Sequence, residues 1–327
     1  MPFAARDQHV PPRGALRDED ARRLATYRKR GLFGCGDAAI TYGRASTAAE
    51  WIAALELVHD CYIDRGFIRP RRCAVRARPH DLCRDTGVYV AIRGGRVVGS
   101  LSTVVDSADL LLPSDRFFPD ELDGLRREGA VAGELTNLAI LQELRGTAVF
   151  TELTRCNAAH ALYVGGCTEL VAAISPAQQP FFELLGFTLL GSRRSCSDEV
   201  EDQVVLMRLT EIRSRWASGA PHARSVDPFL ADFFLHGNPF VPRIDAWDDA
   251  VAAMFDNRDE VADLVCACRD LLEGLSPEER AALRRRLGRA FIDVADAPLP
   301  VRSVSGAYGQ IARTAAMCLD DHILRAS

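Results

Sequence analysis

The chain has 327 residues, of which 48% are hydrophobic and 26% are charged, a composition typical of a soluble globular protein. Its net charge of −5 gives no general attraction to nucleic acid or to an anionic membrane. No apolar run approaches the roughly 20 residues that span a bilayer, and the N-terminus lacks the apolar segment of a signal peptide. Ten cysteines without regular spacing indicate reduced thiols. We therefore expect a cytoplasmic protein with one large domain or two ordinary ones.

The first 46 residues are rich in Arg, Pro and Gly. They contain one amphipathic stretch, Asp18–Arg30, whose acidic start and basic end favour a helix. We interpret residues 1–46 as a loosely attached arm, with a disordered extension as the alternative. A second helix is predicted over Thr47–Asp64, because Thr47 can cap it and apolar residues recur at helical spacing. Gly66 ends this helix.

An arginine-rich segment follows, over residues 65–84. It suggests a docking surface for an acidic partner or a phosphate, with a solvated loop as the alternative. The candidate docking residues are Arg65, Arg69, Arg71 and Arg72. The nearest approach to a metal-binding pattern lies in the same part of the chain and consists of His59, Cys61, Cys73, His80 and Cys83. No CxxC pair supports it and its spacing is unlike that of zinc sites, so we predict no metal.

Two strands are predicted over residues 88–92 and 97–105. The paired glycines between them supply the positive φ angles of a hairpin turn. Residues 106–133 then form an excursion with many large apolar groups, which is too long for a simple connector. We expect this excursion to line a hydrophobic cavity; the alternative is that it only caps the core.

Residues 134–140 predict a strand, because they alternate toward an apolar end after a glycine break. A polar turn with the pair Arg145-Gly146 follows, and a helical pattern then runs from Val149 to Tyr163. A strand, a glycine turn and a helix present unpaired backbone N–H groups to a phosphate. His160 lies within this helix, where a lone histidine is more often structural than catalytic.

The remaining chain divides into two parts. A buried strand over 168–174, a short helix opened by Ser175-Pro176, and strands over 187–191 and 204–209 complete a mixed α/β sheet flanked by helices. A linker-like stretch over 215–226 leads to helices predicted near 228–235, 247–255, 259–273, 277–294 and 305–324. We therefore divide the chain into an arm (1–46), an α/β domain (47–212) and an all-helical C-terminal region (213–327).

The order of these elements resembles the GNAT acyltransferase fold. The resemblance includes the strand that ends at Ile140, the Arg145-Gly146 turn, and the segment Phe181–Phe187. That segment is similar to the "Y-x-x-x-GF" signature of the superfamily, with Phe181 or Phe182 in the aromatic place. Within the superfamily, residues 47–210 are most similar to the bacterial N-acyl amino acid synthases, relatives of the acyl-homoserine-lactone autoinducer synthases. The similar segments are Gly99–Leu101 leading to Asp106, Leu112-Pro113, Phe118–Leu122, Leu125-Arg126 and Glu134–Ala139, with Phe233-Phe234 and Gly237–Pro239 further on.

The resemblance implies a transferase that moves a fatty acyl group from a thioester to the amine of an amino acid or related small molecule. The co-substrate would be acyl-carrier-protein or acyl-CoA, with no permanently bound cofactor, and the carrier protein would dock on the four arginines named above. Glu134 is implied as the base, with a surface strand-end carboxylate as the alternative. Asp106 and Arg126 would bind the ammonium and carboxylate of the acceptor, with a structural pair as the alternative. Further substrate-binding residues are Asn137, Leu138, Ala139, Phe181 and Phe182, and the phosphopantetheine would contact Arg145, Gly146, Thr147 and Ala148.

The phosphate turn departs from the GNAT pattern Q/R-x-x-G-x-G/A. Ala148 and the bulky Phe150 stand at the places of the two small residues, so backbone approach to a pyrophosphate is less open. This departure argues against ordinary acetyl-CoA and is compatible with the single phosphate of a carrier-protein arm. Two alternatives stay open: a conventional acetyl-CoA-dependent N-acetyltransferase, and a non-catalytic GNAT-like binding module.

Overall fold

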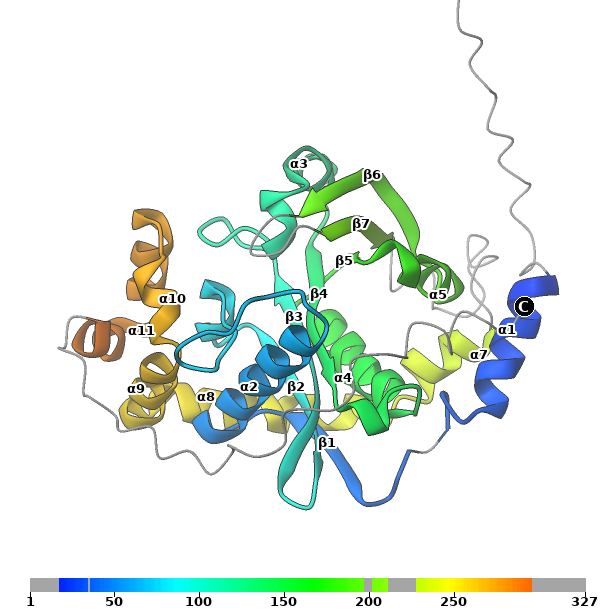
Figure 1. Cartoon of the computed structure of the whole chain (residues 1–327), viewed down its shortest axis with the longest axis horizontal. Coiled ribbons are helices and arrows are strands. Elements are labelled where there is room, and N and C mark those ends of the chain that lie inside the picture. Colours follow the sequence, from blue (N-terminus) through cyan, green and yellow to red (C-terminus); the bar gives the residue numbers. More distant parts are fainter. Residues whose placement is uncertain (1–17, 35, 197–201, 211–227, 296–327) are drawn as a thin grey trace, which may run out of the picture.

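The computed structural model describes residues 18–34, 36–196, 202–210 and 228–295. They form a mixed seven-stranded sheet flanked by helices (Figure 1). The strands are β1 (Ile40–Arg44), β2 (Gly87–Arg93), β3 (Arg96–Val105), β4 (Ala132–Ile140), β5 (Glu169–Ile174), β6 (Thr188–Cys196) and β7 (Asp202–Leu209). Their order across the sheet is β1-β2-β3-β4-β5-β7-β6. Among the described residues, no helix is long and apolar enough to cross a membrane.

The helices pack on both faces of this sheet. They are α1 (Asp18–Lys29), α2 (Ala48–Asp64), α3 (Pro119–Arg127), α4 (Val149–Tyr163), α5 (Gln179–Leu184), α7 (Pro228–Ala231), α8 (Ile244–Asp256), α9 (Arg258–Ala267), α10 (Arg269–Glu273) and α11 (Pro277–Ala295). Short turns of helix are η1 (Pro79–Leu82), η2 (Pro113–Arg116), η3 (Gln142–Leu144) and η5 (Asp232–His236). Side chains of β2 alternate between two cores: Val88 and Val90 pack with α2, while Tyr89 and Ala91 pack with α4.

The strongest sequence signals gave the correct elements. Thr47 caps α2 by accepting a hydrogen bond from the Glu50 N–H at 3.2 Å, as expected for an N-cap threonine. Gly94 and Gly95 both have positive φ in the β2–β3 turn, which suits the twist of a hairpin. The predicted helix over 149–163 matches α4. Residues 1–17 of the predicted arm, the predicted linker over 215–226 and the predicted helix over 305–324 lie outside the described residues.

Two interpretations of the sequence are wrong. Ile40–Arg44 is not part of a loose arm, because it forms β1 and pairs antiparallel with β2 at the edge of the sheet. Leu24 and Tyr27 of α1 also pack into the core beneath α5. The excursion is also not without regular structure, because it contains α3, a short amphipathic helix that buries Leu122 and Leu125.

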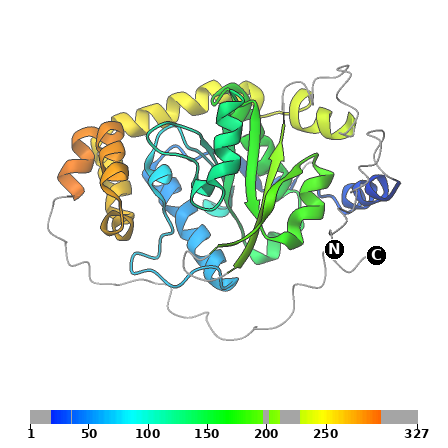
Figure 2. The same ribbon diagram turned by 90° about the horizontal axis from the view of Figure 1, so that it is seen from above.

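The C-terminal helices share a core with α2. Val251, Leu264 and Phe291 are buried in one continuous cluster with Trp51 and Leu55 of α2. Helices α9, α10 and α11 gather at one end of the molecule, and α1 lies with α7 at the other end (Figure 2). The C-terminal helices therefore complete the core on the α2 side of the sheet.

Candidate active site

The centre of the sheet contains a split between β4 and β5. These are the only parallel neighbours within the described sheet, and they pair only over Ala132–Glu134 against Glu169–Val171. Beyond Glu134 the edge of β4 that faces β5 has no strand partner among the described residues. An unpaired strand edge offers backbone N–H and C=O groups to a ligand.

Just beyond Glu134, β4 carries a bulge. Ser100 pairs with Ala139 and Ser102 with Thr136, so two residues of β4, Asn137 and Leu138, stand opposite one residue of β3. Asn137 has a φ of 55°, which is uncommon for a residue other than glycine. The bulge therefore turns the backbone at the position where β4 is free of β5.

Buried polar bonds hold this bulge. The Asn137 amide oxygen accepts a hydrogen bond from Arg76 Nη1 at 2.8 Å, and its Nδ2 donates to Asp81 Oδ1 at 2.7 Å. All three side chains are buried. Burial lowers the pKa of Arg76 to about 10, and the positive charge of Arg78 adds to this effect. The network fixes β4 to η1, which lies beyond the end of α2.

Glu134 is buried on the face of the sheet that the excursion covers. Its Oε2 accepts a hydrogen bond from the Ser114 N–H at 2.9 Å, and its Oε1 accepts one from Ser114 Oγ at 2.8 Å. The residue is 2% exposed, so the alternative of a surface carboxylate is wrong. Burial raises the pKa of Glu134, while the positive charge of Arg78 and the two bonds from Ser114 oppose that rise. A carboxylate of this kind is suited to take a proton once a substrate displaces Ser114.

The excursion packs as a cap on the core. Leu112, Phe118, Leu122 and Leu125 are buried against residues of β3, β4, β5 and β7. The expectation that the excursion lines an open cavity is therefore wrong for this structure, and the alternative of a cap is correct. The sequence could not distinguish the two, because apolar residues that fill a core and those that line a cavity have the same pattern.

An apolar cavity lies on the opposite face of β4. The cavity is small: its volume is about 10 Å³, which is room for about one water molecule. Its lining includes Leu135 of β4, Thr154 and Ala158 of α4, Leu170 of β5, and Leu185 and Phe187 after α5. Because Leu135 and Glu134 are neighbours on one strand, their side chains point to opposite faces. The apolar cavity and the buried carboxylate thus flank the split in the sheet from its two sides.

The turn before α4 presents backbone donors. Gly146 has a φ of 75° and open space around it. The N–H groups of Gly146, Ala148 and Phe150 have no hydrogen-bond partner within the described part of the chain. The Phe150 ring packs edge-on against Phe181, with 5.4 Å between ring centroids. Arg145 Nε donates back to the Ile140 carbonyl at 3.1 Å, which ties the turn to the end of β4. Free N–H groups at a helix start favour an anionic group.

The predicted aromatic pair has two environments. Phe182 is buried and packs against Phe187, so it belongs to the core. Phe181 is half-buried, and its contact with Phe150 places it beside the turn. Neither phenyl ring carries an ionisable hydrogen, so neither can donate a proton to a leaving thiolate. Leu138 belongs to the bulge, and Ala139 follows it in β4.

Asp106 and Arg126 form an ion pair with each other, which was the structural alternative to binding a substrate. Arg126 Nε donates to Asp106 Oδ2 at 2.7 Å, and Nη2 donates to Oδ1 at 2.9 Å. The remaining N–H groups donate to Asp115, at 2.6 and 2.7 Å, and to Asp123, at 2.9 Å. A guanidinium has five N–H donors, and these five bonds use all of them. A substrate carboxylate would have to displace one of the three aspartates.

The arginine-rich segment is partly tied to the C-terminal helices. Arg72 Nη2 donates to Glu273 at 2.6 Å, and its Nε lies 3.4 Å from Asp270 Oδ1. His160 is fully buried beside Tyr89, and burial lowers its pKa to about 3, so it stays neutral near pH 7. Among the described residues, no three His, Cys, Asp or Glu side chains cluster as metal ligands would.

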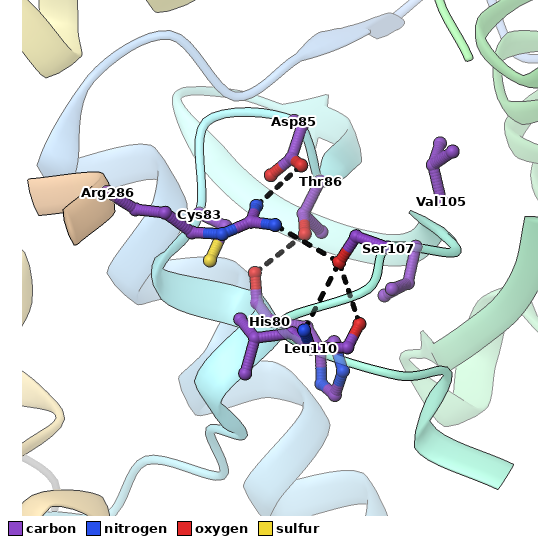
Figure 3. A pocket seen from close by; sticks show the side chains of 9 residues that line it. His80, Cys83, Asp85, Thr86, Val105, Ser107, Leu110 and Arg286 are labelled. Atoms are coloured by element: carbon purple, nitrogen blue, oxygen red, sulfur yellow. Dashed lines mark hydrogen bonds and ion pairs between the residues drawn. The ribbon is translucent and has the colours of Figure 1, made fainter. Parts of the chain in front are cut away.

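A polar pocket lies at the base of the excursion (Figure 3). Arg286 of α11 reaches into it and donates to Asp85 at 2.6 Å, to Asp109 at 2.6 Å, and to Ser107 Oγ at 3.1 Å. His80 Nε2 lies 2.5 Å from the Leu111 carbonyl in the same region. The pocket is thus a junction between the C-terminal region, η1 and the excursion. No local pattern in the chain indicates this junction, because its members are far apart in the sequence.

One family profile matches part of the chain. Residues 53–210 match the sequence profile of the N-acyl amino acid synthase FeeM family. No curated protein matches the sequence significantly. The expected mixed sheet flanked by helices, followed by a helical C-terminal region, is confirmed by the strands and helices of the structure.

Solved structures with a similar fold include three that illustrate its range. FeeM, an N-acyl amino acid synthase from uncultured soil microbes, shares 23% identity over 54% of this chain and 93% of its own, with a TM-score of 0.47. The CoA-dependent acyl-homoserine lactone synthase BjaI shares 19% identity over 65% of this chain and 99% of its own, with a TM-score of 0.44. The putative acetyltransferase YncA from Salmonella typhimurium shares 15% identity over 53% of this chain and 94% of its own, with a TM-score of 0.33.

Proposed function

We propose that the chain acylates an amino acid. The starting point is that residues 53–210 form an N-acyltransferase domain of the N-acyl amino acid synthase family. The donor would be a fatty acyl thioester, carried by an acyl carrier protein or by coenzyme A. The observation that carries the proposal is the split between β4 and β5, which is flanked by Glu134 on one face and by an apolar cavity on the other.

The donor would enter from the α4 side. The phosphate of the phosphopantetheine arm would lie on the N–H groups at Gly146 and Ala148, with Arg145 and Thr147 framing the turn. The thioester would lie along the free edge of β4, and the acyl chain would enter the apolar cavity after the side chains that line it move apart. Each buried methylene contributes about 0.8 kcal/mol, so the size of this cavity would select the chain length.

The acceptor would approach from the Glu134 side. Glu134 would take a proton from the ammonium after Ser114 moves away, and the freed amine would attack the thioester carbonyl. Backbone N–H groups of the bulge, at Asn137 to Ala139, would stabilise the oxyanion of the tetrahedral intermediate. The nitrogen would then lose its second proton to solvent and the C–S bond would break. The departing thiolate would gain a proton from solvent, because Phe181 and Phe182 have none to give.

The test is acyl transfer in vitro with the full chain. Three donors are compared with a mixture of amino acids: a long-chain acyl-carrier-protein, a long-chain acyl-CoA and acetyl-CoA. Mass spectrometry should detect an N-acyl amino acid from at least one long-chain donor, at a higher kcat/KM than any acetylated product. Preferred use of acetyl-CoA would instead indicate the conventional N-acetyltransferase. Equal rates for both long-chain donors would argue against docking of a carrier protein on Arg65, Arg69, Arg71 and Arg72.

A further inference from the structure

A second arginine, Arg78, lies near the buried carboxylate of Glu134. It differs from Arg126 in that its guanidinium is not bonded to any aspartate that the structure describes. Arg78 immediately precedes η1, and its backbone N–H donates to Asp81 Oδ2 at 2.8 Å. Asp81 in turn accepts from Asn137 of the β4 bulge through its other oxygen. A chain of short bonds therefore fixes the Arg78 backbone to the strand that carries Glu134, three residues before Asn137.

The side chain of Arg78 has no hydrogen bond or ion pair to another residue in the described ranges, and it is half-buried. Its charge nevertheless acts on both buried groups beside it: it lowers the pKa of Glu134 and that of Arg76. Two guanidinium groups thus lie close together. Arg76 donates to the neutral amide of Asn137, and Asp81 is the one carboxylate in this hydrogen-bonded network. Such an excess of positive charge favours an anion.

The segment also borders the same space as Ser114. Asp81 of η1 is bonded to the β4 bulge, while His80 contacts the Leu111 carbonyl of the excursion. Ser114, three residues after Leu111, covers both oxygens of Glu134. A ligand that displaced Ser114 from Glu134 would therefore enter between the excursion and the Arg78 segment.

We propose that Arg78 binds the α-carboxylate of the acceptor amino acid and so makes the acceptor site selective for amines that carry an adjacent acid. This inference rests on the proposed function and assigns to Arg78 the role that sequence reasoning gave to Arg126. The carboxylate of a zwitterionic amino acid pairs with Arg78, and its ammonium faces Glu134. An arginine suits this task because its planar fork binds a carboxylate through two parallel bonds.

The experiment compares each of the twenty amino acids with its α-amide, which keeps the amine and the side chain but has no carboxylate. Wild-type protein should show a KM for the acid about 10- to 100-fold below that for the amide, as for a charge-assisted bidentate contact. Arg78→Gln should remove this preference by raising the KM for the acid, with little change in kcat and none in the KM for the amide. Arg78→Lys should recover part of it, and Arg84→Gln, an exposed arginine near the same segment, should behave as wild type.

Binding of the same ligands, measured by calorimetry without donor, separates this inference from the proposed function. Suppose that the wild type binds the acids more tightly than the α-amides, that Arg78→Gln does not, and that no N-acylated product forms with any thioester. The proposed function then fails and the inference stands. Suppose that turnover occurs, and that Arg78→Gln weakens the binding of acids and amides equally or leaves the binding of both unchanged. The inference is then overturned and the proposed function stands. Should Arg78→Gln unfold, Arg78→Lys is compared in its place, and an unchanged preference for acids in that variant counts against the inference.

Discussion

Glu134 and Arg126 are two charged residues of the same face, and the structure treats them in opposite ways. Glu134 is buried with a serine as its hydrogen-bond partner, and its pKa is raised. Arg126 is partly exposed, with every N–H group bonded to an aspartate, and hydrogen bonds first to Asp115 and then to Asp106 raise its pKa. Glu134 is therefore poised to change its protonation state, whereas Arg126 is held in its charged form. This contrast indicates that a buried ionisable group bonded only to neutral partners is a better indicator of chemistry than charge alone.

The largest expected effect is on Glu134. Glu134→Gln should lower kcat by about 10²- to 10⁴-fold, because general base catalysis contributes about that factor. The shape and both hydrogen bonds to Ser114 can be kept, so the melting temperature should not fall. Glu128→Gln, an exposed carboxylate on the same face that pairs with Arg208, is the matched control. Turnover within threefold of wild type in Glu134→Gln would show that this carboxylate is not the base.

The bulge beside Glu134 gives the next effect. Asn137→Ala should lower the free energy of unfolding by about 3 kcal/mol, since it leaves buried Arg76 and Asp81 without a shared partner. Asn137→Gly loses the same bonds but suits the positive φ, so it should be more stable than Asn137→Ala by about 1 kcal/mol. Urea denaturation of the two variants measures this difference. Equal stability would mean that the backbone at residue 137 relaxes.

Arg126 should affect stability rather than substrate binding. Arg126→Ala leaves Asp106 and Asp115 facing each other, and should cost about 1–2 kcal/mol of unfolding free energy in a partly solvated site. The KM for the acceptor should stay within twofold of wild type. Arg127→Ala, the exposed neighbour, serves as control and should change neither quantity. A tenfold rise in the acceptor KM for Arg126→Ala alone would restore the substrate-binding role that the sequence suggested.

The smallest expected effect is on the pH dependence of kcat/KM. As a base with a raised pKa, Glu134 should make kcat/KM rise with pH through a value above that of an ordinary carboxyl group. Ser114→Ala removes one hydrogen bond that lowers this pKa, so the rise should move to higher pH. An acid limb at an ordinary carboxyl pKa, unchanged in Ser114→Ala, would contradict the proposed environment.

The same shift has a consequence for stability. Because the folded pKa is raised, the contribution of Glu134 to stability is present below the unfolded pKa and is lost as pH rises through the folded value. Glu134→Gln cannot ionise, so its unfolding free energy relative to wild type should increase over that pH range. Denaturation of both proteins at several pH values measures this change, and a difference independent of pH would show that Glu134 does not titrate there.

The sequence predicted those parts of the fold that have local signals. Thr47 and the helical spacing located α2, and two glycines located the β2–β3 turn. It missed β1, a five-residue edge strand that contains a glycine and lacks a clear alternation, and it missed α3, which is only nine residues long. Short elements such as these are defined by their tertiary packing more than by their own pattern.

The candidate site was predicted only in part, for a physical reason. The identity of Glu134 and the phosphate turn came from motifs within one strand and one helix start. The contact of Ser114 with Glu134 joins residues 20 positions apart, and the position of Arg78 depends on a network through Asp81 and Asn137. Such contacts arise only when the excursion and η1 fold onto the sheet, so no local pattern in the chain indicates them.

The core that α2 shares with the C-terminal helices sets a lower limit on the length of a useful expression fragment. A fragment cut at residue 210, where the family profile ends, would leave Trp51 and Leu55 without the partners contributed by Leu264 and Phe291. It would also lack Arg286, which ties the excursion to α11. Such a truncation should aggregate, because it exposes a large apolar face, whereas a fragment that extends beyond Phe291 should stay in solution.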